Sequence, residues 1–198
     1  MFIPRHPVVE DQFCQFATTS GTAGIGGVVA YAGAVCYLVS TATNQDAVVN
    51  IYGTVAPTDA EERMPFGFLM QKVKYGYHNV HPSGFMMPGD LGSSDVIAQP
   101  SYDSNGNIAG TRQAPVGVAH LGIWDTVHYE VDTKATDPML PGERLYVAND
   151  GDSKVTNGTQ LTNVSDVVAR VVKGASAAQV AANMNNTTLY PIRIKLLI

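Results

Sequence analysis

Hydrophobic and polar residues alternate along much of this chain, most clearly over residues 114–156. Apolar residues recur there largely at every second position, which is the period of a β-strand with one buried face. Asp150-Gly151 separates residues 145–147 from Val155, and both residues of this pair tolerate the positive φ of tight hairpin turns. Residues 140–143, with Pro second and Gly third, are typical of another turn. The segment predicts an antiparallel sheet.

The same alternation elsewhere predicts more strands and little helix. Strands are predicted at residues 34–39, 47–52, 66–77 and 189–198, and residues 166–173 are a strand or a short helix, with the strand favoured by their β-branched side chains. The Ala-rich residues 175–183 predict a short helix. Thr58 and Glu61 have the spacing of a capping box, and Pro65 limits any helix that begins there. The predicted fold class is therefore all-β: an antiparallel β-barrel or sandwich with an extended N-terminal arm and at most one or two short helices.

Residues 1–27 are predicted to form the extended arm, and residues 28–198 a single β-barrel domain. Pro4 and Pro7 keep the backbone of the arm out of a helix, and residues 18–27 are mainly Gly, Ala, Thr and Ser. Aromatic side chains on a terminus are costly to leave in water, so the apolar residues of the arm are candidate contacts. They can dock on the chain's own core or on a neighbouring protein. These residues are Phe2, Ile3, Phe13 and Phe16.

Residues 78–115 are predicted to be a long irregular loop region within the domain. Loop signals such as Pro82, Pro88-Gly89 and Pro100 follow one another at close intervals. Loops of this length are uncommon inside a compact domain and usually provide a functional or contact surface. The candidate contact residues in this loop are His78, His81, Phe85, Met86 and Met87.

Charge and hydropathy argue against two classes of partner. The net charge is −5 at pH 7, and the 12 Lys and Arg residues form no basic block, so binding to nucleic-acid phosphates is not expected. Residues 21–40 are uncharged and long enough to span a membrane. Their five Gly residues and the lack of a basic flank predict a Gly-rich lead followed by a strand instead.

The two cysteines and the first residues bear on the compartment. Cys14 and Cys36 are isolated in the sequence, which predicts two reduced and partly buried thiols in a protein made in a cytoplasm. The first residues lack the basic-then-apolar order of a signal peptide, so secretion is not expected.

No catalytic residue, metal site or cofactor is predicted. Residues 21–27 are Gly-rich but lack the Gly-Lys-Ser/Thr ending of a phosphate-binding loop. Residues 103–114 begin like a calcium loop, yet Gly falls at the fourth position and the twelfth residue is not Glu. His120 and His128 lie on one predicted strand, where a rise of about 3.3 Å per residue separates them too far to share a metal. Trp124 is predicted to be a core residue.

Several of these segments occur in a recognisable order. They are a short Pro-containing arm, the strand Gly-Ala-Val-Cys-Tyr-Leu at 33–38, Met-Pro-Phe-Gly-Phe-Leu at 64–69, Leu-Pro-Gly-Glu-Arg-Leu-Tyr at 140–146, Val-Ala-Arg-Val-Val-Lys-Gly at 168–174 and an aliphatic last strand. Over most of residues 30–198, this order resembles the head decoration, or cement, proteins of tailed bacteriophages.

The resemblance implies a structural virion protein and no enzyme. Members of this family are β-barrels that bind the outer face of the assembled icosahedral head, commonly as trimers, and clamp neighbouring capsid subunits through a terminal arm. The implied partners are the major capsid protein and other copies of the chain, with no cofactor, nucleic acid or membrane. The implied location is the capsid exterior, after synthesis in the host cytoplasm.

Two alternatives stay open at this point. One is another β-rich virion component, such as a tail tube or fibre, and the other is a ligand-binding β-barrel. The decoration hypothesis also predicts that deleting residues 2–16 leaves the domain folded and abolishes its attachment.

Overall fold

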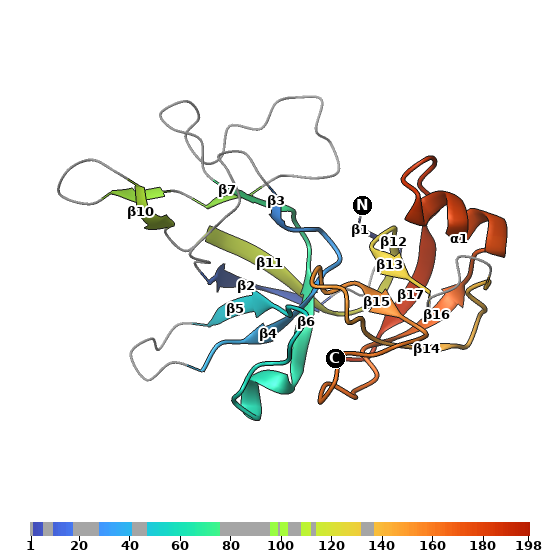
Figure 1. Cartoon of the computed structure of the whole chain (residues 1–198), viewed down its shortest axis with the longest axis horizontal. Coiled ribbons are helices and arrows are strands. Elements are labelled where there is room, and N and C mark those ends of the chain that lie inside the picture. Colours follow the sequence, from blue (N-terminus) through green and yellow to red (C-terminus); the bar gives the residue numbers. More distant parts are fainter. Residues whose placement is uncertain are drawn as a thin grey trace.

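The computed structural model describes the backbone of residues 2–5, 10–17, 28–40, 47–75, 96–98, 100–102, 108–111, 114–131 and 137–198. Within these ranges it also describes the side chains, except at residues 4, 10–13, 74, 75, 96–111, 114 and 115. The fold is mainly β, as the sequence predicts, with a closed barrel beside a larger sheet (Figure 1).

Five strands close the barrel in the order β11-β2-β5-β4-β6. Their bounds are Glu10–Phe16 (β2), Val35–Leu38 (β4), Val48–Ile51 (β5), Pro65–Leu69 (β6) and Ala114–Leu121 (β11). β2 runs parallel to β5, and the other neighbouring pairs are antiparallel. Buried apolar side chains, including Cys36, Val49 and Val116, fill the interior. The barrel interior is therefore a packed core.

Seven strands form the second sheet in the order β1-β12-β17-β16-β14-β15-β13. Their bounds are Phe2–Pro4 (β1), Ile123–Thr126 (β12), Tyr129–Glu130 (β13), Arg144–Val147 (β14), Val155–Thr156 (β15), Ala169–Lys173 (β16) and Ile192–Leu196 (β17). The predicted hairpin at Asp150-Gly151 is confirmed, because Tyr146 pairs with Thr156 and Gly151 has φ +83°.

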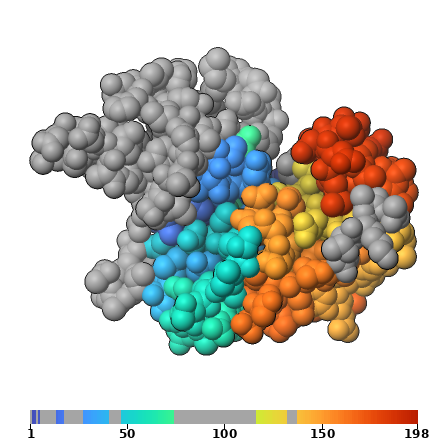
Figure 2. Space-filling model, in the orientation of Figure 1, coloured from blue at the N-terminus to red at the C-terminus, as the bar shows by residue number. Residues whose placement is uncertain are grey.

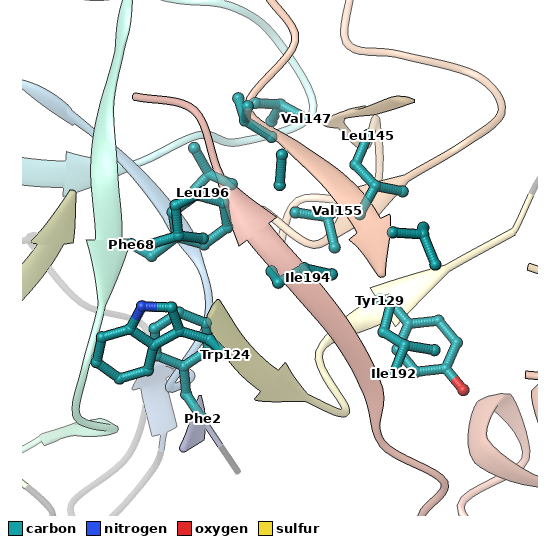
Figure 3. Packing of buried hydrophobic residues seen from close by; sticks show 14 of the residues in the cluster. Phe2, Phe68, Trp124, Tyr129, Leu145, Val147, Val155, Ile192, Ile194 and Leu196 are labelled. Atoms are coloured by element: carbon teal, nitrogen blue, oxygen red, sulfur yellow. The ribbon is translucent and has the colours of Figure 1, made fainter. Parts of the chain in front are cut away.

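β11 and β12 form one segment that bends at Gly122, and this bend joins the barrel to the sheet. Gly122 has φ +115°, a conformation that other residues rarely adopt. Beyond the bend, Trp124 is 1% exposed, which confirms its predicted place in the core. Its ring stacks on Phe2, which in turn stacks on Phe68 of the barrel (Figure 3). The inner residues of β17, namely Ile192, Ile194 and Leu196, belong to the same core.

A buried serine makes a second connection between the barrel and the loop after β14. Ser153 Oγ donates to Tyr52 O (3.0 Å) and accepts from Tyr52 N (2.6 Å), while Val35 N donates to Ser153 O (2.9 Å). Figure 2 shows residues 51–75 in cyan against residues 145–165 in orange. The barrel and the sheet therefore pack together as one body.

The remaining strands correct two predictions. β3 (Val28–Ala30), β7 (Val73–Tyr75) and β8 (Val96–Ala98) form a three-stranded sheet, and β9 (Pro100–Tyr102) pairs with β10 (Ile108–Thr111). The single strand predicted at 66–77 is wrong: β6 ends at Leu69, Gln71 Oε1 accepts a hydrogen bond from Gly117 N, and β7 then joins another sheet. Residues 78–115 are not irregular throughout, because the backbones of β8, β9 and β10 pair in ladders.

Two helical segments are described. α1 (Ala177–Met184) confirms the predicted Ala-rich helix, and a capping box between Ser176 and Gln179 begins it. Residues 61–63 form a single turn of 3-10 helix, η1 (Glu61–Arg63). The cap predicted from Thr58 is wrong, because Asp59 Oδ1 accepts from Glu61 N at 3.0 Å.

The predicted extended arm is wrong for the described residues 2–5 and 10–17. β1 pairs with β12 at the edge of the large sheet, and β2 pairs with both β11 and β5 inside the closed barrel. Phe2 and Phe16 are 5% and 2% exposed. Removing these apolar side chains from water stabilises the fold, so the segment packs on the chain's own core. Deleting residues 2–16 would remove a barrel strand, which contradicts the predicted tolerance of that deletion.

Candidate interaction surface

The large sheet has an inner face in the core and an outer face toward solvent. On β17, Ile192, Ile194 and Leu196 are buried, whereas Lys195 is exposed and Arg193 is partly exposed. This alternation is the two-residue period of a strand. It places every cation of β17 on the outer face.

Three cations from three neighbouring strands form a row on that face, which we call the cation row. Arg144 of β14 lies opposite Arg170 of β16, and Arg170 lies opposite Lys195 of β17. All three side chains are exposed, and none forms an ion pair with a described carboxylate. Like charges directly opposite in a sheet destabilise it by a few tenths of a kcal/mol to about 1 kcal/mol per pair. The stability of the chain alone therefore does not explain this row.

The next row on the same face contains its own counterion, and we call it the clamp row. Asp125 of β12 lies between Arg5, whose Nε donates to Oδ2 at 2.7 Å, and Arg193, whose Nε donates to Oδ1 at 2.8 Å. Burial alone would raise the pKa of the Asp125 carboxyl, but the hydrogen bonds from Arg193 and Arg5 lower it below its ordinary value. The hydrogen bonds of Arg193 to Asp125 in turn raise the pKa of the Arg193 guanidinium. The clamp row ties the segment that follows β1 to the sheet.

The outer face concentrates positive charge on an acidic chain. Half of the 12 Lys and Arg residues lie on or beside it: Arg5, Arg144, Arg170, Lys173, Arg193 and Lys195. Asp125 is the one acidic residue within β1, β12, β14, β16 and β17. The face also exposes aliphatic side chains, since Val172 and Leu197 are 44% and 45% exposed. A mixed cationic and apolar surface of this kind suits a protein partner.

An open groove of about 630 Å³ lies where the end of β17 meets the barrel. Its walls are Phe66, His120, Leu121, Lys195, Leu196, Leu197 and Ile198. His120 Nδ1 donates to Phe66 O at 2.8 Å, because a carbonyl oxygen can only accept. The other ring nitrogen, Nε2, is buried and has no hydrogen-bond partner among the described residues. Leu121 and Leu197 keep the groove mouth apolar, at 40% and 45% exposure.

A second hollow of about 360 Å³ lies between β13 and the end of α1, and structural bonds occupy many of its polar groups. His128 bonds to Asp152 O through Nε2 at 2.8 Å, and burial lowers the pKa of its imidazole to about 4. Lys154 forms ion pairs with Asp150 and Asp152. Asn183 donates to the carbonyl of residue 127. This arrangement favours a structural role for the polar lining.

The residues predicted as contacts are not brought together on one surface. Phe2 and Phe16 are core residues, and Ile3 is partly buried on β1 opposite Asp125. Phe13 belongs to β2, where its backbone pairs with Gly117, but its side chain lies outside the described part. The predicted contact loop residues His78, His81, Phe85, Met86 and Met87 lie outside the described residues.

Within the described ranges, no group of three or more His, Cys, Asp and Glu side chains is arranged to hold a metal ion. His120 packs edge-on against Phe66 and His128 stacks with Tyr31, so the bend at Gly122 places the two histidines in separate surroundings. No helix in the described part is long and apolar enough to cross a membrane.

Both cysteines are free thiols, as predicted, and they are fully buried where partial burial was predicted. Cys36 Sγ donates to Gly67 O at 3.4 Å, and burial raises the pKa of the Cys36 thiol. A thiol that stays protonated inside a packed barrel is a poor nucleophile.

The cation row was missed in the sequence because its members are far apart along the chain. Arg193 and Lys195 do alternate with buried aliphatic residues, which is a usable signal for one cationic strand face. The register that sets Arg144 and Arg170 beside Lys195 depends on strand pairing over long sequence separations. A chain without a basic block in its sequence can therefore still form a basic patch on its surface.

No protein-family model and no curated protein matches this chain.

Proposed function

We propose that this protein is a structural component of a phage virion that binds the outer surface of the assembled capsid and bridges neighbouring capsid subunits. The observation that carries the proposal is the cation row, Arg144, Arg170 and Lys195, which lies on the sheet without an ion pair to a described carboxylate. A sheet that keeps like charges opposite one another is expected to gain its counterions from a partner. The major capsid protein is the proposed partner, and a homotrimer is the proposed state of this protein.

Binding to the assembled shell stabilises it by mass action. A protein that binds only the joined state of two subunits adds its binding free energy to the cost of separating them. Repetition around a symmetric shell multiplies a modest interface, and a trimer presents the same face three times. The packed barrel interior favours this surface role over the binding of a ligand inside the barrel.

The direct test is attachment to heads of the phage that encodes the chain, prepared without this protein. The variant R144Q/R170Q/K195Q removes the charges of the cation row. The control variant T58E/Q160E/T162E changes three exposed residues outside the outer face. Both variants shift the net charge of −5 by three in the same direction.

Wild-type protein and the control are expected to cosediment with the heads, whereas the row variant loses at least tenfold in affinity. Binding should also weaken as salt rises, because the contacts are ionic. If the wild-type protein does not bind heads, or if it assembles by itself into tubes, the capsid proposal fails.

A further inference from the structure

The apolar groove and the cation row form one continuous surface. Lys195 is both a wall of the groove and the first member of the row. From Lys195 the row continues over β16 to Arg170 and over β14 to Arg144. An apolar recess is therefore followed directly by three unpaired cations.

We infer that this combined surface binds an extended acidic segment of a partner protein. One aliphatic side chain of the segment occupies the groove, and the carboxylates that follow it lie over the cation row. The identity of the partner as the capsid protein rests on the function proposed above. The chemistry of the segment rests on the surface alone.

The dimensions of the row fit such a segment. Neighbouring strands are about 4.8 Å apart, so Lys195 and Arg144 are separated by roughly 10 Å across the sheet. Side chains on one side of an extended peptide recur about every 6.6 Å. Two or three carboxylates at alternate positions therefore cover the row, within the reach of Lys and Arg side chains. Arg170 and Arg144 can each bind a carboxylate through two parallel hydrogen bonds.

The apolar part of the surface favours a protein partner over nucleic acid. Phe66, Leu121 and Leu197 line the groove, and a phosphodiester backbone has no side chain to fill it. The net charge of −5 repels a long polyanion beyond the patch itself. A short acidic segment with an aliphatic anchor meets both the charge and the shape of this surface.

The experiment uses a synthetic, acetylated and amidated peptide of sequence Gly-Leu-Ser-Glu-Ser-Glu-Ser-Glu-Gly, in which Leu and all three Glu residues lie on one side of an extended chain, with the isotope-labelled full chain. Binding is followed by the shifts of backbone amide signals in nuclear magnetic resonance spectra. The largest shifts are expected at the end of β17, in β16 and β14, and near Phe66 and Leu121. R144Q/R170Q/K195Q is expected to raise the Kd about tenfold, whereas T58E/Q160E/T162E leaves it nearly unchanged.

The apolar anchor has its own matched pair of variants. Leu197→Ser changes a groove wall that is 45% exposed, and Leu38→Ser changes a leucine of β4 that is 40% exposed and lies outside both the groove and the outer face. Leu197→Ser should raise the Kd several-fold, and Leu38→Ser should leave it unchanged. Equal binding of a peptide with Ser in place of Leu would overturn the role of the groove. Equal or tighter binding of a DNA duplex of 12 base pairs would overturn the choice of a protein segment.

The outcome is distinguishable from that of the capsid experiment. Peptide binding without head attachment supports this inference and removes the capsid as the partner. Head attachment without any peptide binding at millimolar concentration overturns this inference and leaves the proposed function standing.

Discussion

The cation row and the clamp row lie two residues apart on the same sheet face, but only the clamp row contains a carboxylate. In the clamp row, Asp125 lies between Arg5 and Arg193 and forms hydrogen bonds with both guanidinium groups. In the cation row, Arg170 lies between two more cations. The difference shows that the outer face carries a carboxylate where Arg5 and Arg193 are bound within the chain. The row without a counterion is therefore the part of the face that is left for a partner.

The largest effect on stability is expected from truncating Phe2 of β1, the strand that precedes Arg5 of the clamp row. Phe2 is 5% exposed and its ring centroid lies 4.4 Å from that of Trp124. Phe2→Ala should lower the free energy of unfolding by about 3 to 4 kcal/mol, because it empties a core site between the barrel and the sheet. Urea unfolding followed by tryptophan fluorescence measures this loss.

Ile3 provides the matched control for that variant. It is adjacent to Phe2 on β1 but is only partly buried, on the opposite face of the strand. Ile3→Ala should cost less than half as much as Phe2→Ala. Equal losses of unfolding free energy for the two variants would show that β1 does not pair with β12 with Phe2 opposite Thr126 and Ile3 opposite Asp125.

Breaking the clamp row itself should have a smaller effect. Asp125→Asn keeps the size of the side chain and removes the charge that Arg5 and Arg193 share. Because both arginine side chains are more than a third exposed, solvent screens the pairs. We expect a loss of about 1 kcal/mol in unfolding free energy at low salt.

Asp137→Asn is the control for the clamp row, since Asp137 is exposed and lies outside the five strands of the outer face. It should change stability by no more than a few tenths of a kcal/mol. A double-mutant cycle between Asp125→Asn and Arg193→Gln should show coupling. Strict additivity of the two variants would mean that the ion pair contributes nothing.

The clamp row also predicts a dependence on pH. The pKa of Asp125 is lowered in the folded protein, so the folded state binds fewer protons than the unfolded state near the ordinary value of 3.8. The stabilisation is therefore fully present above that pH and is lost as pH falls through the folded pKa. The difference in unfolding free energy between wild type and Asp125→Asn should shrink as the pH is lowered from 6 to 3. A constant difference over that range would contradict the lowered pKa.

Some features of the fold could be predicted from the sequence, and the two rows could not. The alternation in β17 and the turns at Gly142 and Gly151 predicted strands and reversals correctly, since both are local properties of the backbone. The Gly-rich and Pro-containing start of the chain suggested an arm, but β2 completes a closed barrel through pairing with β11 and β5. Such long-range pairing also creates the cation row. Local pattern carries no information about which distant strands will become neighbours.

The smallest change in stability is expected from a charge reversal inside the cation row. This change tests the comparison of the two rows most directly. Arg170→Glu gives the row the arrangement of the clamp row, with a carboxylate between two cations. The variant should be more stable than Arg170→Gln by about 0.5 kcal/mol at low salt, because the Glu carboxylate attracts Arg144 and Lys195 across the strands and the neutral Gln does not. Arg170→Gln is the proper baseline, since it removes the charge while keeping a side chain of similar length.

The same reversal should act in the opposite direction on binding. Arg170→Glu is expected to weaken attachment to heads more than Arg170→Gln does, although it makes the free protein more stable. In 1 M salt, where the screening length is about 3 Å, the stability difference between the two variants should vanish. If Arg170→Glu proves less stable than Arg170→Gln at low salt, charges at these positions do not interact across the strands, and repulsion among the three cations has no basis. The row would then need no partner to neutralise it, and its difference from the clamp row would have no functional meaning.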